Sequence, residues 1–291
     1  MRNKKKNKTV VITGANSGLG LRLAIFLVKK NYEVVLCSRK LSNLNKVLKD
    51  TTGINHNLIH TIKADVSNKK DVNKIKKYLH TKLDNNVDVL VNNASVIGPI
   101  GEFSDNNIDD WINTININLI GSVIMTNLLI PLFKKKGKGK IIQLSGGGAS
   151  GPFPNFSSYA TSKIGIVRFI ETISVELKKY NIDANCIAPG FMNTNMQKNV
   201  VMAGEKKVGK QYYEKVSKVL ELDNDNFNKP INLIEFLISN KSDGITGKFI
   251  SAVWDNWKIF SQNKKKLSNT DVFTLRRIVG KDRKFKKGDL W

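Results

Sequence analysis

Short apolar runs alternate with longer stretches of helical periodicity along most of this 291-residue chain, and this alternation restricts its possible folds more than any other feature. Apolar runs of about four to eight residues bounded by turn signals predict buried strands, and apolar residues three and four apart predict amphipathic helices. The predicted strands are Thr9–Thr13, Glu33–Ser38, Leu58–Ala64, Val87–Asn92, Lys140–Ser145, Asp183–Ala188 and Gly247–Ser251. The predicted helices are Leu19–Lys30, Ser42–Thr51, Lys70–Leu83, Asp109–Phe133, Ser158–Tyr180 and Asn228–Ser239.

Strands joined through helices form βαβ units, which build a parallel sheet with helices on both faces. The pattern therefore predicts an α/β, doubly wound, seven-stranded Rossmann fold, with residues 1–251 as one domain. Residues 252–291 extend past the last predicted strand, and clusters around Trp254 and Phe273 would be costly to expose to water. We expect this extension to pack on the domain or on a neighbouring subunit, with Arg276 and Arg277 available to an anionic substrate group.

The chain is strongly basic, with 48 Lys and Arg against 24 Asp and Glu and a net charge of +24. Such a charge attracts nucleic acid or anionic membranes without specificity. The excess is mostly lysine spread along the chain, however, and no basic segment carries the interleaved aromatic residues of a strand-binding surface. We expect no specific nucleic-acid partner.

Predictions about localisation and metal content rest on the lack of a membrane span, a signal peptide and a cluster of metal ligands in the sequence. No apolar run approaches the roughly 20 residues of a membrane span, and the apolar stretch behind the basic N-terminus is too short for a signal peptide. Cys37 and Cys186 fall in predicted buried strands, and the three histidines are scattered. These features predict a cytoplasmic protein with reduced thiols, no membrane span and no metal.

The turn after the first predicted strand is rich in glycine, reading Thr13-Gly14-Ala15-Asn16-Ser17-Gly18-Leu19-Gly20. A diphosphate needs main-chain N–H groups and a helix N-terminus within contact distance, and side chains at the glycines would hold it away. This spacing between a strand and a helix predicts a dinucleotide site. The residues expected to contact the dinucleotide here are Gly14, Asn16, Ser17, Gly18, Leu19 and Gly20.

The end of the second predicted strand predicts which dinucleotide is preferred. An acidic residue there would accept hydrogen bonds from a free ribose 2′-hydroxyl, but the chain has Ser38 and Arg39. A guanidinium beside a small hydroxyl suits a 2′-phosphate. We therefore expect NADP(H) to be preferred over NAD(H).

Tyr159 and Lys163 lie one helical turn apart near the start of a long predicted helix. A phenol has a pKa of about 10 and moves protons poorly at neutral pH unless a cation stabilises its phenolate. Lys163 is placed to supply that cation.

Four motifs in order make the chain resemble a short-chain dehydrogenase/reductase from Thr9 to Ser251. They are Thr13 to Gly20, Asn92-Asn93-Ala94-Ser95, Tyr159 to Lys163, and Pro189-Gly190. The resemblance implies an NAD(P)-dependent oxidoreductase that transfers hydride between a nicotinamide and a carbonyl or secondary alcohol, working as a homodimer or homotetramer. It implies catalytic roles for Asn118, Ser145, Tyr159 and Lys163. It implies further cofactor contacts at Asp65, Val66, Asn92, Ala94, Tyr159, Lys163, Pro189, Gly190 and Thr194.

Two positions depart from the family pattern. Ser95 replaces the last glycine of the Asn-Asn-Ala-Gly motif, and it either narrows the nicotinamide pocket or only adds a hydroxyl. The substrate-orienting serine usually lies thirteen residues before the tyrosine, where this chain has Gly146. We expect Ser145 to take that role, with Ser150 or loss of the serine as alternatives.

The substrate is the least determined property of the sequence. The extension after Ala252 is similar to that of family members in sugar and surface-polysaccharide pathways, which implies a sugar or sugar-nucleotide type of substrate. The alternative function is a catalytically degenerate, dinucleotide-binding regulatory protein.

Overall fold

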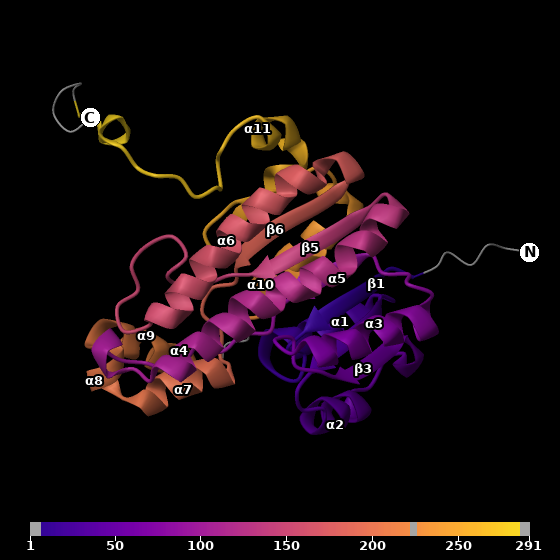
Figure 1. The fold of residues 1–291 in the computed structure, drawn as a ribbon, viewed down its shortest axis with the longest axis horizontal. Helices are drawn as coiled ribbons and strands as arrows, with labels where there is room; N and C mark the ends of the chain where they lie inside the picture. Colours follow the sequence, from indigo (N-terminus) through magenta and orange to yellow (C-terminus); the bar gives the residue numbers. More distant parts are fainter. Residues whose placement is uncertain (1–6, 222–225, 286–291) are drawn as a thin grey trace, which may run out of the picture.

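A parallel sheet of seven strands runs through the molecule, with helices on both faces (Figure 1). The computed structural model describes residues 7–221 and 226–285, so the outermost residues of the predicted units 1–251 and 252–291 lie outside the described part. The strands are β1 (Thr9–Thr13), β2 (Glu33–Ser38), β3 (Ile59–Lys63), β4 (Val89–Asn92), β5 (Gly139–Leu144), β6 (Ile182–Ala188) and β7 (Phe249–Ser251). The predicted doubly wound α/β fold is confirmed.

The strand order β3-β2-β1-β4-β5-β6-β7 places a change of winding direction between β1 and β4. Ile12 of β1 pairs with Leu36 of β2 on one side and with Val91 of β4 on the other. In an open parallel sheet, ligands bind at the carboxyl ends of the strands where the winding direction changes. The loops that follow β1, β2 and β4 are therefore the natural walls of a binding site.

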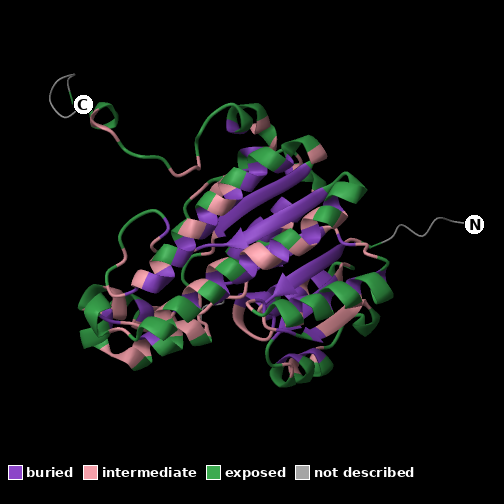
Figure 2. Ribbon diagram, in the orientation of Figure 1, coloured by how far each residue is buried: buried purple, intermediate pink, exposed green. Residues whose placement is uncertain are grey.

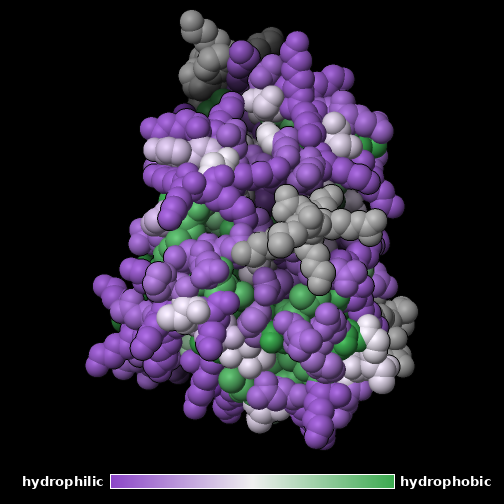
Figure 3. Space-filling view, turned by 90° about the vertical axis from the view of Figure 1, so that its right-hand side faces the viewer, coloured by the Kyte–Doolittle hydropathy of each residue, from purple (hydrophilic) through white to green (hydrophobic). Residues whose placement is uncertain are grey.

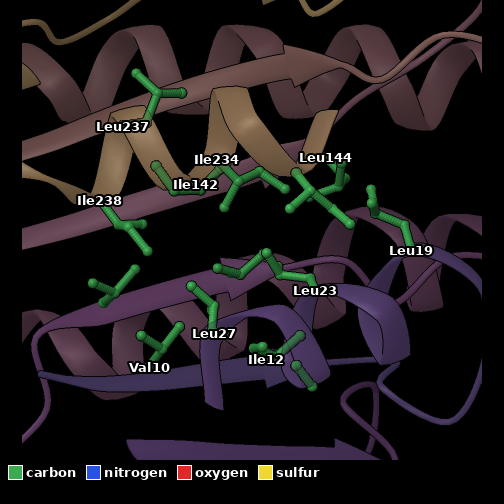
Figure 4. Packing of buried hydrophobic residues seen from close by; sticks show 14 of the residues in the cluster. Val10, Ile12, Leu19, Leu23, Leu27, Ile142, Leu144, Ile234, Leu237 and Ile238 are labelled. Atoms are coloured by element: carbon green, nitrogen blue, oxygen red, sulfur yellow. The ribbon is translucent and has the colours of Figure 1, made fainter. Parts of the chain in front are cut away.

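One face of the sheet is covered by α1 (Gly18–Lys29) and α10 (Asn228–Ile238). Figure 4 shows leucines of α1 and aliphatic side chains of α10 meeting strand residues such as Ile12 and Ile142. These side chains are almost completely buried, which is why the strands read as continuous apolar runs (Figure 2).

The other face packs against α3 (Lys69–Leu83), α5 (Gly121–Lys136) and α6 (Ser157–Leu177). The predicted helix Asp109–Phe133 is divided in the structure into α4 (Ile108–Ile115), a π-helical turn η3 (Asn116–Ile120) and α5. A π-turn inserts an extra residue into the helix, so it changes the direction of the side chains that follow.

The stretch Ile108–Lys136 is long and apolar enough, by length and composition alone, to cross a membrane. Met125, Leu129 and Phe133 of this stretch are fully buried in the protein core. One side of α5 in this stretch therefore packs into the core of the α/β domain. On the side of the molecule turned toward the viewer in Figure 3, hydrophilic residues cover most of the surface.

The described residues between β6 and α10 form three helices, α7 (Asn195–Ala203), α8 (Glu205–Val208) and α9 (Lys210–Glu221). They lie together beyond one end of the sheet, beside the start of α6 (Figure 1). We call these three helices the lid. A helix α2 (Ser42–Asp50) completes the half of the domain that contains β1 to β3.

The described part of the C-terminal extension lies against its own domain as far as Leu275. The N–H of Phe249 in β7 donates to the main-chain oxygen of Phe273 at 2.7 Å, so the extension covers the outer edge of the sheet. Arg168 on α6 donates to the oxygen of Leu275 at 2.7 Å, and the Leu275 N–H donates to Glu171 at 2.8 Å. Contact with a neighbouring subunit stays a prediction.

Candidate active site

A cavity of about 490 Å³ follows the carboxyl ends of the strands around the change of winding direction. It gathers predicted residues from five separate segments of the chain. Those that line it are Gly14, Asn16, Ser17, Gly18, Leu19, Ser38, Arg39, Asp65, Val66, Ala94 and Thr194. Among the described residues, the lining also includes Cys37, Ser95, Ile97, Gly98, Met192 and Met196. It does not include Gly20, Asn92, Asn118, Ser145, Tyr159, Lys163, Pro189 or Gly190.

Main-chain atoms of the glycine loop form part of the cavity wall. Gly14 has a φ of +65°, and a Cβ built there would lie 2.7 Å from the Cα of Ala94. Ser17 is the N-cap residue of α1, and its side chain makes no capping hydrogen bond with the helix. The first N–H groups of α1 are therefore not capped by Ser17, as a diphosphate site requires. A dinucleotide fits these residues.

The turns after β1 and β4 are held together by Asn93, a residue to which the sequence motif had assigned no role. Its Nδ2 donates to the oxygens of Thr13 and Gly14 at 2.9 and 3.0 Å. A Cβ at Gly20 would lie 2.6 Å from this Nδ2, so Gly20 is required for packing against Asn93. The neighbouring Asn92 is buried and donates to Thr126 at 3.0 Å, which braces β4 against α5.

The end of the cavity beside β2 carries its charged side chains. Arg39 is exposed and, within the described residues, forms no ion pair. The Ser38 hydroxyl donates to the main-chain oxygen of Lys40 at 3.1 Å. The Asp65 carboxylate accepts from the N–H and the hydroxyl of Ser67, which fixes its orientation at the cavity wall.

The loop after β6 borders the cavity through Thr194. A Cβ at Gly18 would lie 3.3 Å from the Thr194 methyl group, so the glycine loop and this loop are in close contact. Gly190 has a φ of +86°, and a Cβ there would lie 2.5 Å from Val253. Gly190 therefore positions the loop against the C-terminal extension and does not itself line the cavity.

Tyr159 and Lys163 both lie in the first part of α6 and are deeply buried, at 9% and 2% exposed. The Lys163 Nζ lies 5.2 Å from the centre of the Tyr159 ring and donates to the oxygen of Leu144 at 3.3 Å. Burial raises the pKa of the Tyr159 hydroxyl above its ordinary value, the opposite of the lowering expected from the lysine. The phenol is therefore in its proton-donating form at neutral pH.

Burial also lowers the pKa of Lys163, to about 8. After Tyr159 has donated its proton, its phenolate is stabilised by the Lys163 cation, which is present only below that pH. We therefore expect kcat/KM for carbonyl reduction to fall with a slope of one proton above about pH 8, because kcat/KM reports ionisations of the free enzyme. A profile measured from about pH 7 to about pH 10 checks this.

The Lys163→Met variant is the control for this profile. Its kcat/KM should be lower at every pH, and its pH profile should lack the fall that begins near pH 8 in the wild-type enzyme. A break that persists in the variant would assign the ionisation to another group.

Asn118 lies in the π-turn and is fully buried. Its Oδ1 accepts from the Val96 N–H and the Ser95 hydroxyl at 2.8 and 3.1 Å, and its Nδ2 donates to Val96 and to Ser162. Asn118 thus joins the loop after β4 to α6, the helix that carries Tyr159. Ser95 adds a hydrogen bond to this junction as well as lining the cavity.

The residue that faces the Tyr159 hydroxyl is Gly146. A Cβ at Gly146 would lie only 2.7 Å from the Tyr159 oxygen. The Ser145 hydroxyl instead donates to the main-chain oxygen of Lys163 at 3.2 Å, and Ser150 is exposed. In this structure Ser145 therefore ties β5 to α6, and its role in orienting the substrate stays a prediction.

Comparisons with known proteins agree with this geometry. The family model described as short chain dehydrogenase matches residues 8–204. A Sus scrofa protein named Dehydrogenase/reductase SDR family member 4 is 29% identical over 245 residues, which cover 84% of this chain and 85% of that protein. An Arabidopsis thaliana protein named 11-beta-hydroxysteroid dehydrogenase-like 3 is 33% identical over 191 residues, covering 65% of this chain and 60% of that protein.

Solved structures show the same fold. A xylitol dehydrogenase bound to NAD+ superposes with a TM-score of 0.74 at 25% identity, covering 85% of this chain and 98% of that chain. ElxO with NADP bound gives a TM-score of 0.72 at 23% identity, covering 85% and 97%. The family match and the arrangement of the glycine loop, Tyr159 and Lys163 lead to one conclusion. This chain belongs to the short-chain dehydrogenase/reductase family and is an NAD(P)-dependent oxidoreductase that acts on CH–OH or C=O groups.

Proposed function

We propose that the chain is an NADP(H)-preferring oxidoreductase that reduces a carbonyl compound or oxidises a secondary alcohol. The observation that carries the cofactor preference is Arg39, an exposed guanidinium on the cavity wall with no ion-pair partner among the described residues. It follows directly after β2, where this fold places the adenosine ribose. A 2′-phosphate would give the Arg39 guanidinium an anionic partner.

The bound nicotinamide supplies or accepts the hydride, and the chain's own residues handle the proton. In reduction, the Tyr159 hydroxyl donates its proton to the substrate oxygen. Lys163 stabilises the phenolate that remains, because its ammonium lies close to the Tyr159 ring. Asn118 positions α6, which carries Tyr159, against the loop after β4.

One observation favours the regulatory alternative. Gly146 offers no hydroxyl beside Tyr159, so the usual second donor to the substrate oxygen is absent from that position. Binding of dinucleotide with no turnover of any carbonyl compound would support this alternative. The intact pair of Tyr159 and Lys163 supports the enzyme.

The cofactor preference has a direct test. We expect NADPH to bind more tightly than NADH in a fluorescence titration, and the double variant Ser38→Asp, Arg39→Leu to reverse the order, because the new carboxylate repels a 2′-phosphate. Lys40→Leu is the matched control, since Lys40 is exposed and follows Arg39 but does not line the cavity. Tighter binding of NADH to the wild-type protein would refute the proposal.

The remaining expectations stay predictions. A cytoplasmic location and a homodimer or homotetramer are proposed from the sequence and the family. The sugar-type substrate was expected from the C-terminal extension. Arg276 forms an ion pair with Asp271, and neither Arg276 nor Arg277 lines the described cavity, so no contact in the structure supports an anionic substrate there.

A further inference from the structure

A row of aromatic rings leads from Tyr159 to the protein surface. The Tyr159 ring lies edge-on to Phe153 at 6.4 Å between centres, Phe153 lies edge-on to Tyr212 at 4.9 Å, and Tyr212 contacts Phe191 at 5.9 Å. We call Phe153, Tyr212 and Phe191 the aromatic row. Phe153 and Tyr212 are partly exposed, and Phe191 is 40% exposed.

Phe153 and Tyr212 of the aromatic row belong to the same apolar cluster as two residues that line the cofactor cavity. Ile97 and Met196 line the cavity and pack in one cluster with Tyr159, Phe153 and Tyr212. Ile97 follows β4, whereas Arg39 follows β2, and β1 separates these strands in the sheet. The row therefore begins at the end of the cavity that is far from the ribose-binding side chains.

The glycines after β5 allow the row to lie directly against the sheet. A Cβ at Gly147 would lie 3.3 Å from the Phe153 ring, and one at Gly148 would lie 2.8 Å from the Ala160 Cα. Together with Gly146, these residues place main chain and no polar side chain beside Tyr159 and Phe153. A substrate bound beside Tyr159 and Phe153 would contact the faces and edges of aromatic rings.

Of the described residues that line the cavity, only Arg39 and Asp65 are charged, and both lie at the ribose end. The other end of the cavity, where Ile97 and Met196 pack in one cluster with Tyr159, therefore favours a neutral, apolar group over an anionic one.

We propose that the aromatic row binds a flat aromatic ring attached to the substrate carbonyl, so that aryl ketones and aldehydes are the substrate class. This proposal rests on the proposed function, because Tyr159 must act on that carbonyl. A planar ring packs edge-to-face with Phe153 and Tyr212, and a saturated ring of the same size cannot form these contacts. The expected preference for the planar ring is roughly tenfold.

The experiment uses acetophenone and cyclohexyl methyl ketone, which differ in the planarity of the ring and, through conjugation, in the reactivity of the carbonyl. The change of their kcat/KM ratio between variants is therefore the test, and we expect Phe153→Leu and Tyr212→Leu to lower the ratio of acetophenone to cyclohexyl methyl ketone roughly tenfold relative to the wild-type enzyme with NADPH. Tyr212→Phe keeps the ring and should keep the preference. Phe169→Leu is the matched control, because Phe169 is a partly buried phenylalanine of α6 outside the row.

Ligand-observed NMR with the same two ketones and the NADPH-loaded protein measures binding independently of turnover. If acetophenone binds more tightly, and Phe153→Leu abolishes the difference, the aromatic row is confirmed even when neither ketone is reduced, and only the proposed function fails. A kcat/KM ratio that is unchanged in Phe153→Leu overturns the row while the enzyme function stands. Absence of binding by both ketones overturns it as well.

Discussion

The Tyr159→Phe variant should lose turnover by about 10²- to 10⁴-fold, the range that a positioned acid or base contributes. The substitution removes only the hydroxyl, and that hydroxyl faces Gly146. Among the described residues, Tyr159 does not line the cofactor cavity, so the affinity for NADPH should hardly change. Steady-state kinetics and a fluorescence titration of NADPH measure the two effects separately.

Tyr213→Phe is the control for this variant, since it removes a phenolic hydroxyl from the same apolar cluster and Tyr213 is not part of the aromatic row. It should retain most of the wild-type kcat. A Tyr159→Phe protein with wild-type kcat on a reduced carbonyl compound would show that another group donates the proton.

The Gly14→Ala variant should weaken NADPH binding by more than about tenfold and lower the melting temperature. The added methyl group would meet the main chain of Ala94 at 2.7 Å, and main chain cannot rotate away as a flexible side chain can. The glycine loop and the turn after β4 must then separate, which moves the N–H groups that a diphosphate needs. Titration with NADPH and thermal unfolding measure both effects.

Gly53 provides a matched control for the backbone conformation. Its φ of +71° is close to the +65° of Gly14, but a Cβ at Gly53 meets nothing within 4 Å. Gly53→Ala carries the strain of a left-handed alanine without the collision, so it should lower stability by about 1 kcal/mol and leave NADPH affinity intact. Equal effects of the two substitutions on NADPH binding would mean that the contact with Ala94 does not matter.

The order of strands and helices was predictable because burial on both faces gives each strand a continuous apolar run. Strands β1 and β2 have the predicted bounds, and the other strands differ by one to two residues at their ends. The π-turn at Asn116–Ile120 was not predictable, since helical periodicity continues through it. The sequence favoured an amphipathic helix in the segment of the lid but did not give the bounds of its helices, because they pack on each other and on the residues around Phe156 and Tyr159 rather than on a face of the sheet.

The residues of the cofactor cavity were largely predictable, because a diphosphate must approach main-chain N–H groups closely. This approach requires glycine at particular spacings. The roles of Asn93 and Gly146 were not, because each depends on which atom faces which neighbour. From the sequence we expected Lys163 to lower the pKa of Tyr159, and this direction was wrong. A neighbouring charge is visible in a sequence, whereas the depth of burial that raises this pKa appears only in three dimensions.

The hydrogen bond between Phe249 and Phe273 also bears on how the protein behaves at high concentration. A sheet edge with open N–H and C=O groups is a template for strands of other molecules, and such pairing leads to aggregation. Strand β7 forms one edge of this sheet, and residues of the extension occupy it. A chain cut after Ser251 would therefore be expected to form insoluble aggregates during expression, even if the catalytic groups were intact.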